Sequence, residues 1–427
     1  MRMANRLVPA AYRQVLRVPG FRRLLAGESV SFLGDGLSVV AISWLAIQIT
    51  EPDRAALVVG AAVAAYTLPA ALGAAGLARW LSRVDPRRLV IANALLRAVT
   101  LGAAAACHLL GVLTPVLYVV LLALSSLLAA WGTAGTYTLV SALVPAEHRL
   151  AANTLLGTSQ TTAIILGPPL AGVLVAVAGP AAVLAFDAAT YLVLAAQLRR
   201  VPAPAVAGED VPRTAGGFRI LARRPQLLGL LALTAVFFFL YGPVEVALPL
   251  FIVDVLGRDA GFLGAYWAVF GVGALLGGLI AGTLRTLSPW PFAIAVIAGW
   301  GACLLPFGFT TSVWVTMAGM ALGGIIYGPF PAFNVTLFQT AADPADLPAV
   351  LAARGSVMVA AAPIGAALGG PLVGRLGPAD TLLASGAATV GLAALALLAS
   401  ALPLTAVRKG AFLSESDVEG HLPHRAA

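Results

Sequence analysis

Long apolar stretches constrain this chain more than any other feature of its sequence. Twelve of them follow one another along the 427 residues, and each is long enough to cross about 30 Å of hydrocarbon as a helix. They cover 21–48, 56–81, 89–112, 115–143, 151–178, 180–198, 226–255, 261–284, 290–309, 313–339, 349–374 and 379–404. The sequence therefore predicts an all-α membrane protein with twelve transmembrane helices.

Composition excludes a soluble protein. Hydrophobic residues make up 60% of the chain and charged residues 10%, against about 45–50% and about 25% in soluble domains. The net charge of +8 is dispersed in short clusters between apolar stretches, so we expect no nucleic-acid partner. The first stretch carries Glu28 and Asp35 and is too long for a cleavable signal peptide.

The sequence offers no pattern for a metal site, a disulfide framework or catalysis. Cys107 and Cys303 lie inside apolar stretches, and the four histidines have no neighbours at metal-ligand spacing. No phosphate-binding loop and no serine nucleophile elbow is found. We therefore expect no cofactor and no enzymatic activity, and energy for any transport would come from an ion gradient.

Basic residues predict the orientation in the membrane. Arginines cluster before the first span, between the second and third spans, and in the polar segment 199–225, whereas the opposite turns hold only Arg54, Arg258 and Arg375. Because Lys and Arg favour the cytoplasmic side, we expect both termini in the cytoplasm, in the inner membrane. The predicted organisation is an N-terminal arm (1–20), a six-helix bundle (21–198), a central loop (199–225), a second bundle (226–405) and a tail (406–427).

An internal repeat supports the division into two bundles. The fifth span of each bundle carries the same glycines and proline at one constant spacing. Gly157, Gly167, Gly172, Gly179 and Pro180 correspond to Gly355, Gly365, Gly370, Gly377 and Pro378. Two parallel repeats related by an axis along the membrane normal would produce this pattern.

Four local patterns resemble the major facilitator superfamily, and within it the macrolide-efflux-like branch of drug:proton antiporters. Gly34-Asp35-Gly36 resembles the opening of that branch, and Phe186 to Tyr191 resembles its sixth span. Gly76 to Leu89 resembles the superfamily's signature turn between spans two and three. The run Gly167, Pro168, Pro169 and Gly172 resembles the antiporter motif of span five, where it implies a bend.

The resemblance implies two pseudo-symmetric six-helix halves that rock about a central site. It also implies a cytoplasmic gate at the signature turn, formed by Ser82, Arg83, Asp85, Arg87 and Arg88. Ser82 stands where the family has an acid that helps to lock this gate. The lock is therefore in question unless Asp85 replaces that acid.

Ionisable residues within spans usually face a cavity or a partner, because a charge in hydrocarbon is costly. Asp35 follows Leu24 by 11 residues, about 16 Å along a helix and near the membrane midplane. Glu28 lies almost on the same face, and Glu245 and Asp187 are further candidates for proton coupling. Arg97 has a similar depth and is the candidate partner of Asp35, an arrangement that would keep Asp35 ionised.

Aromatic residues in spans four, seven and ten are candidates for a substrate cavity, because the resemblance implies that these spans line it. An apolar aromatic cavity suits a lipophilic substrate, including a cationic one. The candidates are Trp131, Tyr137, Phe238, Tyr241, Tyr327, Phe330 and Asn334.

These observations predict a monomeric secondary transporter that exports lipophilic drugs or metabolites by proton antiport with alternating access. Its expected partners are the lipid bilayer, protons and a small lipophilic molecule. Three alternatives stay open at this point: an exporter dedicated to one natural product or siderophore, a nutrient importer, and a membrane sensor that binds a ligand without moving it.

Overall fold

The structure is a computed structural model, and it describes residues 10–77, 81, 84–201, 214–280, 288–343 and 346–401. Within these residues, twelve helical segments are long and apolar enough to span a membrane. The twelve predicted spans are thereby confirmed in number and order.

Helices of the first half follow the predicted spans closely. A short helix α1 (Ala10–Arg17) lies in the predicted arm and precedes the first span. The spans are α2 (Pro19–Gln48), α3 (Pro52–Gly76), α5 (Pro86–Leu109), α6 with α7 (Pro115–Ser126 and Ala129–Leu143), α8 (Arg149–Ala178) and α9 (Pro180–Arg199).

The second half repeats this order. The predicted central loop contains a helix that the sequence analysis did not anticipate, α10 (Thr214–Arg223), which packs on α16. The spans are α11 with a π-helical end η3 (Pro225–Leu250 and Phe251–Val255), α12 (Ala260–Ile280), α13 with η5 (Pro289–Leu304 and Leu305–Gly308), α14 with α15 (Val313–Tyr327 and Phe330–Ala341), α16 (Leu347–Leu376) and α17 (Pro378–Ala401).

The internal repeat extends to backbone conformation. Gly179 ends α8 with φ of 83° and ψ of 160°, and Gly377 ends α16 with φ of 83° and ψ of 164°. A positive φ costs glycine little, and each of the two glycines is followed by a proline that starts the next helix. The fifth and sixth spans of the two halves are therefore joined by the same turn.

Spans four and ten are interrupted, which the apolar pattern did not predict. α7 begins after a break at Leu127 and Leu128, and α15 begins after Gly328 and Pro329. The first break packs tightly, since a Cβ on Gly73 would lie 1.9 Å from the carbonyl oxygen of Leu127. Irregular backbone at membrane depth is tolerated where it is buried in protein or lines a cavity.

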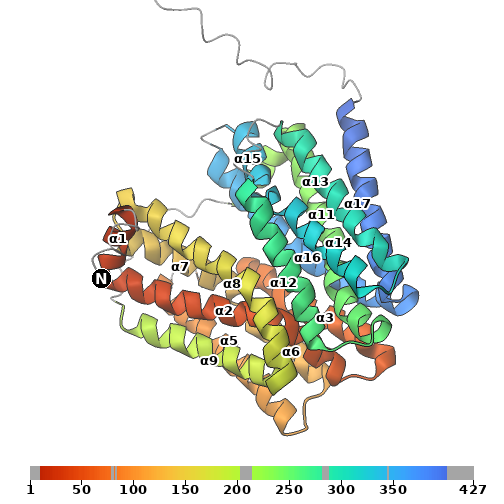
Figure 1. The fold of residues 1–427 in the computed structure, drawn as a ribbon. Helices are drawn as coiled ribbons and strands as arrows, with labels where there is room; N and C mark the ends of the chain where they lie inside the picture. Colours follow the sequence, from red (N-terminus) through yellow and green to blue (C-terminus); the bar gives the residue numbers. More distant parts are fainter. Residues whose placement is uncertain are drawn as a thin grey trace, which may run out of the picture.

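The two halves meet at one end and diverge at the other. Figure 1 shows α2, α5, α8 and α9 in one group and α11, α13, α14, α16 and α17 in the other. Packing between the halves is formed mainly by two helix pairs. α8 of the first half packs on α12 of the second, and α3 of the first half packs on α16 of the second. We call the side with the α2–α3 and α8–α9 turns the closed end, and the opposite side, where α2 begins and α17 ends, the open end (Figure 1).

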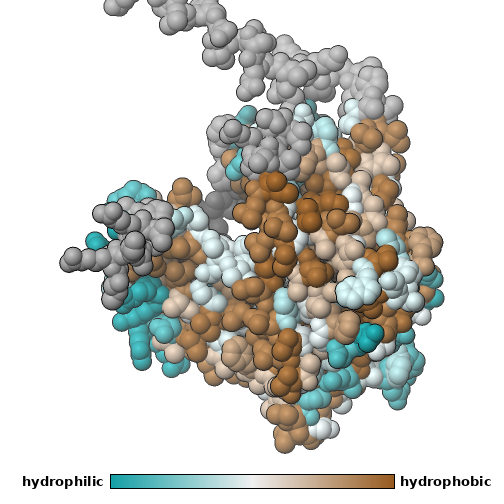
Figure 2. Space-filling model, in the orientation of Figure 1, coloured by the Kyte–Doolittle hydropathy of each residue, from teal (hydrophilic) through white to brown (hydrophobic). Residues whose placement is uncertain are grey.

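Apolar side chains cover the outside of the helices. Figure 2 shows hydrophobic residues over much of the visible surface, with hydrophilic residues gathered toward the ends of the helices. Trp314, Leu150 and Val177 are more than four-fifths exposed. Apolar patches of this extent mark a lipid or protein contact, and on twelve spanning helices they face the lipid.

Candidate functional site

A cavity of about 830 Å³ lies between the two halves. Two acidic residues line it among the described residues, Asp35 from α2 and Glu245 from α11, and no Lys, Arg or His does. Much of the remaining wall is aromatic: Phe32, Tyr66, Phe237, Phe238, Tyr241, Trp267, Phe270, Trp300 and Tyr327 line it. Such a volume and such a lining are typical of sites for drug-sized molecules.

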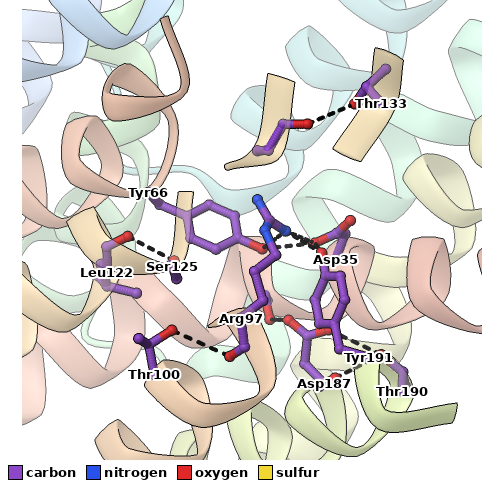
Figure 3. A network of polar contacts seen from close by, with 12 residues as sticks. Asp35, Tyr66, Arg97, Thr100, Leu122, Ser125, Thr133, Asp187, Thr190 and Tyr191 are labelled. Carbon is purple, nitrogen blue, oxygen red and sulfur yellow. Dashed lines mark hydrogen bonds and ion pairs between the residues drawn. The ribbon is translucent and has the colours of Figure 1, made fainter. Parts of the chain in front are cut away.

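An ionic cluster of the first half adjoins the cavity and reaches it through Asp35 and Tyr66 (Figure 3). One carboxylate oxygen of Asp35, Oδ1, accepts three hydrogen bonds. They come from Arg97 Nη1 at 2.7 Å, Tyr191 Oη at 2.6 Å and Tyr66 Oη at 2.8 Å. Four different spans, α2, α3, α5 and α9, supply these side chains, so the cluster ties most of the first half to one carboxylate. The predicted pairing of Asp35 with Arg97 is present.

Arg97 is enclosed more fully than its partner. Its side chain is 9% exposed, whereas that of Asp35 is 37% exposed and reaches the cavity. The rings of Tyr66 and Tyr191 flank the guanidinium, with centroids 5.0 Å and 5.1 Å from its central carbon. The Nε atom of Arg97 is buried without a hydrogen-bond partner.

Glycines bring this part of α2 into contact with its neighbours. A Cβ on Gly34 would lie 2.2 Å from Asp187 Oδ1, and one on Gly36 would lie 2.4 Å from the carbonyl oxygen of Ala163. Larger residues on either side of Asp35 would push α9 and α8 away. The glycines of the predicted motif therefore permit close helix packing around the carboxylate.

Asp187 is separate from the cavity. It is fully buried, and its carboxylate accepts hydrogen bonds from Ser38 at 2.5 Å and Thr190 at 3.2 Å. It lies between α9 and α2, beside the ionic cluster (Figure 3). The sequence placed it among the candidates for proton coupling, and its observed contacts hold two helices together.

Glu28 lines a second, smaller pocket of about 140 Å³ toward the open end. It is 6% exposed and accepts a hydrogen bond of 2.5 Å from Thr136 of α7. Asp35 and Arg97 also line this pocket, and so does Asn93, whose buried Oδ1 has no partner. Glu28 and Asp35 lie along one helix, as predicted, and both line this polar pocket.

The structure distributes the predicted cavity residues unevenly. Phe238, Tyr241 and Tyr327 line the large cavity, and Tyr137 lines the small pocket. Trp131, Phe330 and Asn334 line neither.

These three side chains are engaged in packing and hydrogen bonds between helices. The Nε1 atom of Trp131 donates to the carbonyl oxygen of Gly73, and Phe330 is buried beside Phe237. Asn334 donates to Thr234 and accepts from Arg354. Periodicity alone did not separate the faces of spans four and ten, because both spans are broken.

The predicted gate is described only in part. Ser82 and Arg83 lie outside the described residues. Asp85 caps α5 by accepting from the backbone N–H of Arg87 at 2.7 Å. Arg87 donates to the carbonyl oxygen of Val201 at 2.6 Å, tying the start of α5 to the end of α9, and Arg88 is exposed. The assignment of these residues to a gate stays a prediction.

The predicted bend lies inside one continuous helix, since Pro168 and Pro169 are within α8. The bend itself stays a prediction, and the glycines of this run make close contacts between helices. Gly167 packs on Gly36, and Gly172 packs on Gly264 of the second half.

Several site residues were missed by the sequence analysis. Tyr66, Trp267, Phe270 and Trp300 line the cavity, and Tyr191 belongs to the ionic cluster. A tyrosine deep in an apolar span is a usable signal, because its buried hydroxyl needs a partner. Among the described residues, no group of three or more His, Cys, Asp or Glu is placed to hold a metal ion.

Comparison with known proteins decides the family. The sequence model of the Major Facilitator Superfamily matches residues 24–366, most of the chain. The chain belongs to this superfamily. It is thus a multi-pass membrane protein with the fold of a family of transporters, as the sequence motifs predicted.

Similar members of the superfamily include two drug efflux proteins. The multidrug efflux pump Tap of Mycolicibacterium fortuitum is 27% identical over 380 residues, covering 85% of this chain and 90% of that protein. Macrolide efflux protein A of Streptococcus pyogenes is 24% identical over 385 residues, covering 86% and 92%. An uncharacterized MFS-type transporter of Sinorhizobium fredii, y4rN, is 29% identical over 376 residues, covering 85% and 91%.

Solved structures of the superfamily share the fold. A bacterial homologue of the human lysosomal transporter Spinster, in an inward-facing and occupied conformation, superposes with a TM-score of 0.69 at 14% identity, over 92% of this chain and 98% of that chain. The nucleoside transporter NupG superposes with a TM-score of 0.66 at 14% identity, over 90% and 99%.

Proposed function

We propose that this superfamily member exports lipophilic drugs or metabolites across the cytoplasmic membrane by proton antiport. The observation that carries the proposal is the cavity between the halves, whose aromatic wall faces a carboxylate engaged by a buried arginine. Similarity to Tap and to macrolide efflux protein A supports export rather than import.

The orientation follows from the arginines. With the arginine-rich turns in the cytoplasm, the open end faces the cytoplasm and the closed end faces outward. The cavity then receives substrate from inside the cell. Export requires a second state in which the closed end parts and the open end closes.

Asp35 is the proposed proton carrier because its carboxylate both lines the cavity and belongs to the buried cluster. Its carboxylate is accessible from the cavity, and its charge compensates Arg97. Protonation of Asp35 would leave the guanidinium without its counter-charge, so the cluster would rearrange. A proton and a substrate can exchange only if each prefers a different state of the halves.

Substrate-driven proton movement tests the proposal. The purified protein is placed in liposomes with an internal pH dye, and a panel of lipophilic drugs is added. We expect drug-dependent proton flux that is lost in Asp35→Asn and kept in Asp380→Asn, which removes an exposed carboxylate at the closed end.

Other outcomes identify other functions. Drug binding without proton flux in the wild-type protein would contradict proton antiport and favour a facilitator, another coupling ion or a sensor. Failure of every drug in the panel to bind would contradict the proposed substrate range and favour a dedicated exporter.

A further inference from the structure

Five aromatic side chains of the second half form a continuous surface on the cavity wall. We call Tyr241, Trp267, Phe270, Trp300 and Tyr327 the aromatic cage, and all five line the cavity. The centroid of the Trp300 ring lies 6.0 Å, 5.4 Å and 6.4 Å from those of Tyr241, Phe270 and Tyr327. The faces and edges of these rings together offer an apolar surface with negative electrostatic potential over each ring face.

The cage takes the place that the ionic cluster has in the first half. Asp35 precedes Gly36, which packs on Gly167 of α8, and Tyr241 precedes Gly242, which packs on Gly365 of α16. Gly167 and Gly365 correspond in the internal repeat, so Tyr241 is the counterpart of Asp35. At corresponding positions the two halves therefore present different chemistry to one cavity: a carboxylate paired with a buried arginine in the first half and an aromatic ring in the second.

Glu245 adds a charge to the cage. It follows Tyr241 by one helical turn on the same face of α11 and lines the cavity. Within the described part of the chain its carboxylate has no hydrogen bond and no ion pair. The other acid of the cavity, Asp35, is already paired with Arg97. Glu245 is thus the carboxylate whose counter-charge is missing, and carboxylates in spans normally have one.

We infer that the aromatic cage and Glu245 form a binding site for bulky, lipophilic, singly charged organic cations. Aromatic faces attract cations, most strongly when both are removed from water, and the carboxylate supplies the opposite charge. One uncompensated carboxylate matches one positive charge. This inference rests on the proposed transport function and names its substrate class.

Binding to the purified protein in detergent, measured by equilibrium dialysis, tests the site without any transport step. Tetraphenylphosphonium and tetraphenylborate have the same shape and opposite charge. We expect the cation to bind on the order of tenfold or more tighter than the anion, since the cage and carboxylate favour one sign. A dication with two separated charges should bind more weakly than tetraphenylphosphonium. Equal binding of the two tetraphenyl ions, or no binding of the cation, would overturn the inference.

Variants locate the site. We expect Glu245→Gln to weaken tetraphenylphosphonium binding about tenfold and to leave tetraphenylborate binding unchanged or stronger. Glu147→Gln is the matched control, because it removes an exposed carboxylate outside the cavity. Trp300→Phe keeps an aromatic face and should retain binding, whereas Trp300→Leu should weaken it. The Glu245→Gln protein must elute from size-exclusion chromatography as a single species, which shows that it is folded. If that protein binds tetraphenylphosphonium with unchanged affinity, the role of Glu245 is refuted.

Failure of the inference differs from failure of the proposed function. If the protein exchanges neutral drugs for protons but does not bind tetraphenylphosphonium, the proposed function stands and the inference of a cation-binding site is wrong. If tetraphenylphosphonium binds through Glu245 but neither it nor any drug moves protons, the site stands and proton antiport is wrong.

Discussion

Gly172 and Gly264 meet across the boundary between the two halves: a Cβ on either glycine would lie 2.7 Å from the Cα of the other. The repeat reproduces this contact on the other side of the cavity, where a Cβ on Gly60 would lie 3.0 Å from the Cα of Gly370. Gly172 and Gly370 correspond in the repeat. Two equivalent glycine crossings, α8 with α12 and α3 with α16, therefore hold the closed end together.

Gly172→Leu should open the closed end. Its side chain has no room beside Gly264, and overpacking of this kind costs about 1–3 kcal/mol, which here falls only on the state with the closed end shut. The readout is the labelling rate of Ile164→Cys, which lines the cavity, in a background lacking Cys107 and Cys303. In the proposed orientation the closed end faces outward. We therefore expect an impermeant maleimide to label this cysteine faster from the outer side of the membrane and more slowly from the cytoplasmic side.

Gly157→Leu is the control for this prediction. Gly157 lies on the same helix, and a Cβ there would meet nothing within 4 Å. Labelling rates in this variant should match the background. Unaltered labelling in Gly172→Leu would mean that the glycine crossing does not decide which end is closed.

How much of this arrangement the sequence reveals depends on the residue. The repeat of Gly172 as Gly370 was visible in the sequence, and the spans followed from apolar length alone. The partners Gly264 and Gly60 were not predicted, because contacts between halves depend on helix rotation. Glycine spacing does not fix that rotation.

The site was predictable where a residue had an obligatory partner. A deep Asp35 and a deep Arg97 at similar depth implied each other, because neither charge is stable alone in hydrocarbon. Trp131 and Asn334 gave no such constraint, because an aromatic ring can pack against any neighbouring helix and an amide can form hydrogen bonds with any of them. Both residues follow the breaks in spans four and ten, and neither lines the large cavity.

Asp35→Asn should destabilise the fold more than Arg97→Gln. The first change leaves a guanidinium that is 9% exposed without its counter-charge, whereas the second leaves a carboxylate that reaches the cavity. Losing one partner of a buried pair costs about 3–5 kcal/mol. For Asp35→Asn we expect a smaller loss of about 1–3 kcal/mol, because Asp35 is 37% exposed and water screens the pair.

Thermal unfolding in detergent measures the difference, with Asp380→Asn as a control in which an exposed carboxylate is lost. The double variant Asp35→Asn/Arg97→Gln should recover part of the loss, because no unpaired charge remains. Additive losses in the double variant would show that the two residues are not energetically coupled.

Asn334 should tolerate Asp but not Leu. Its Oδ1 accepts from Arg354 Nε at 3.0 Å and Nη2 at 2.5 Å, and no acid among the described residues pairs with Arg354. Asn334→Leu removes the acceptor of a partly buried guanidinium, for which we expect about 2–4 kcal/mol of destabilisation. Asn334→Asp keeps the acceptor and adds a counter-charge, so its unfolding midpoint should equal or exceed that of the wild type.

Thr336→Leu, on the exposed face of the same helix, controls for the loss of a polar side chain from α15. Its unfolding midpoint should stay close to that of the wild type. Equal stability of the Leu and Asp variants at position 334 would contradict a role for Asn334 in satisfying Arg354.

Asp343 forms an exposed ion pair that should respond to pH and salt but contribute little. The hydrogen bond and charge of Arg224 lower the pKa of the Asp343 carboxyl below its ordinary value of 3.8. A lowered pKa in the folded state stabilises the protein above that ordinary value, and the contribution disappears as pH falls through the folded-state pKa. Because water and salt screen exposed pairs, Asp343→Asn should change the unfolding midpoint at pH 7 only slightly, and not at all in about 1 M salt. Unfolding scans at both salt concentrations check this, and a large midpoint shift that survives high salt would show that Asp343 has a structural role beyond the ion pair.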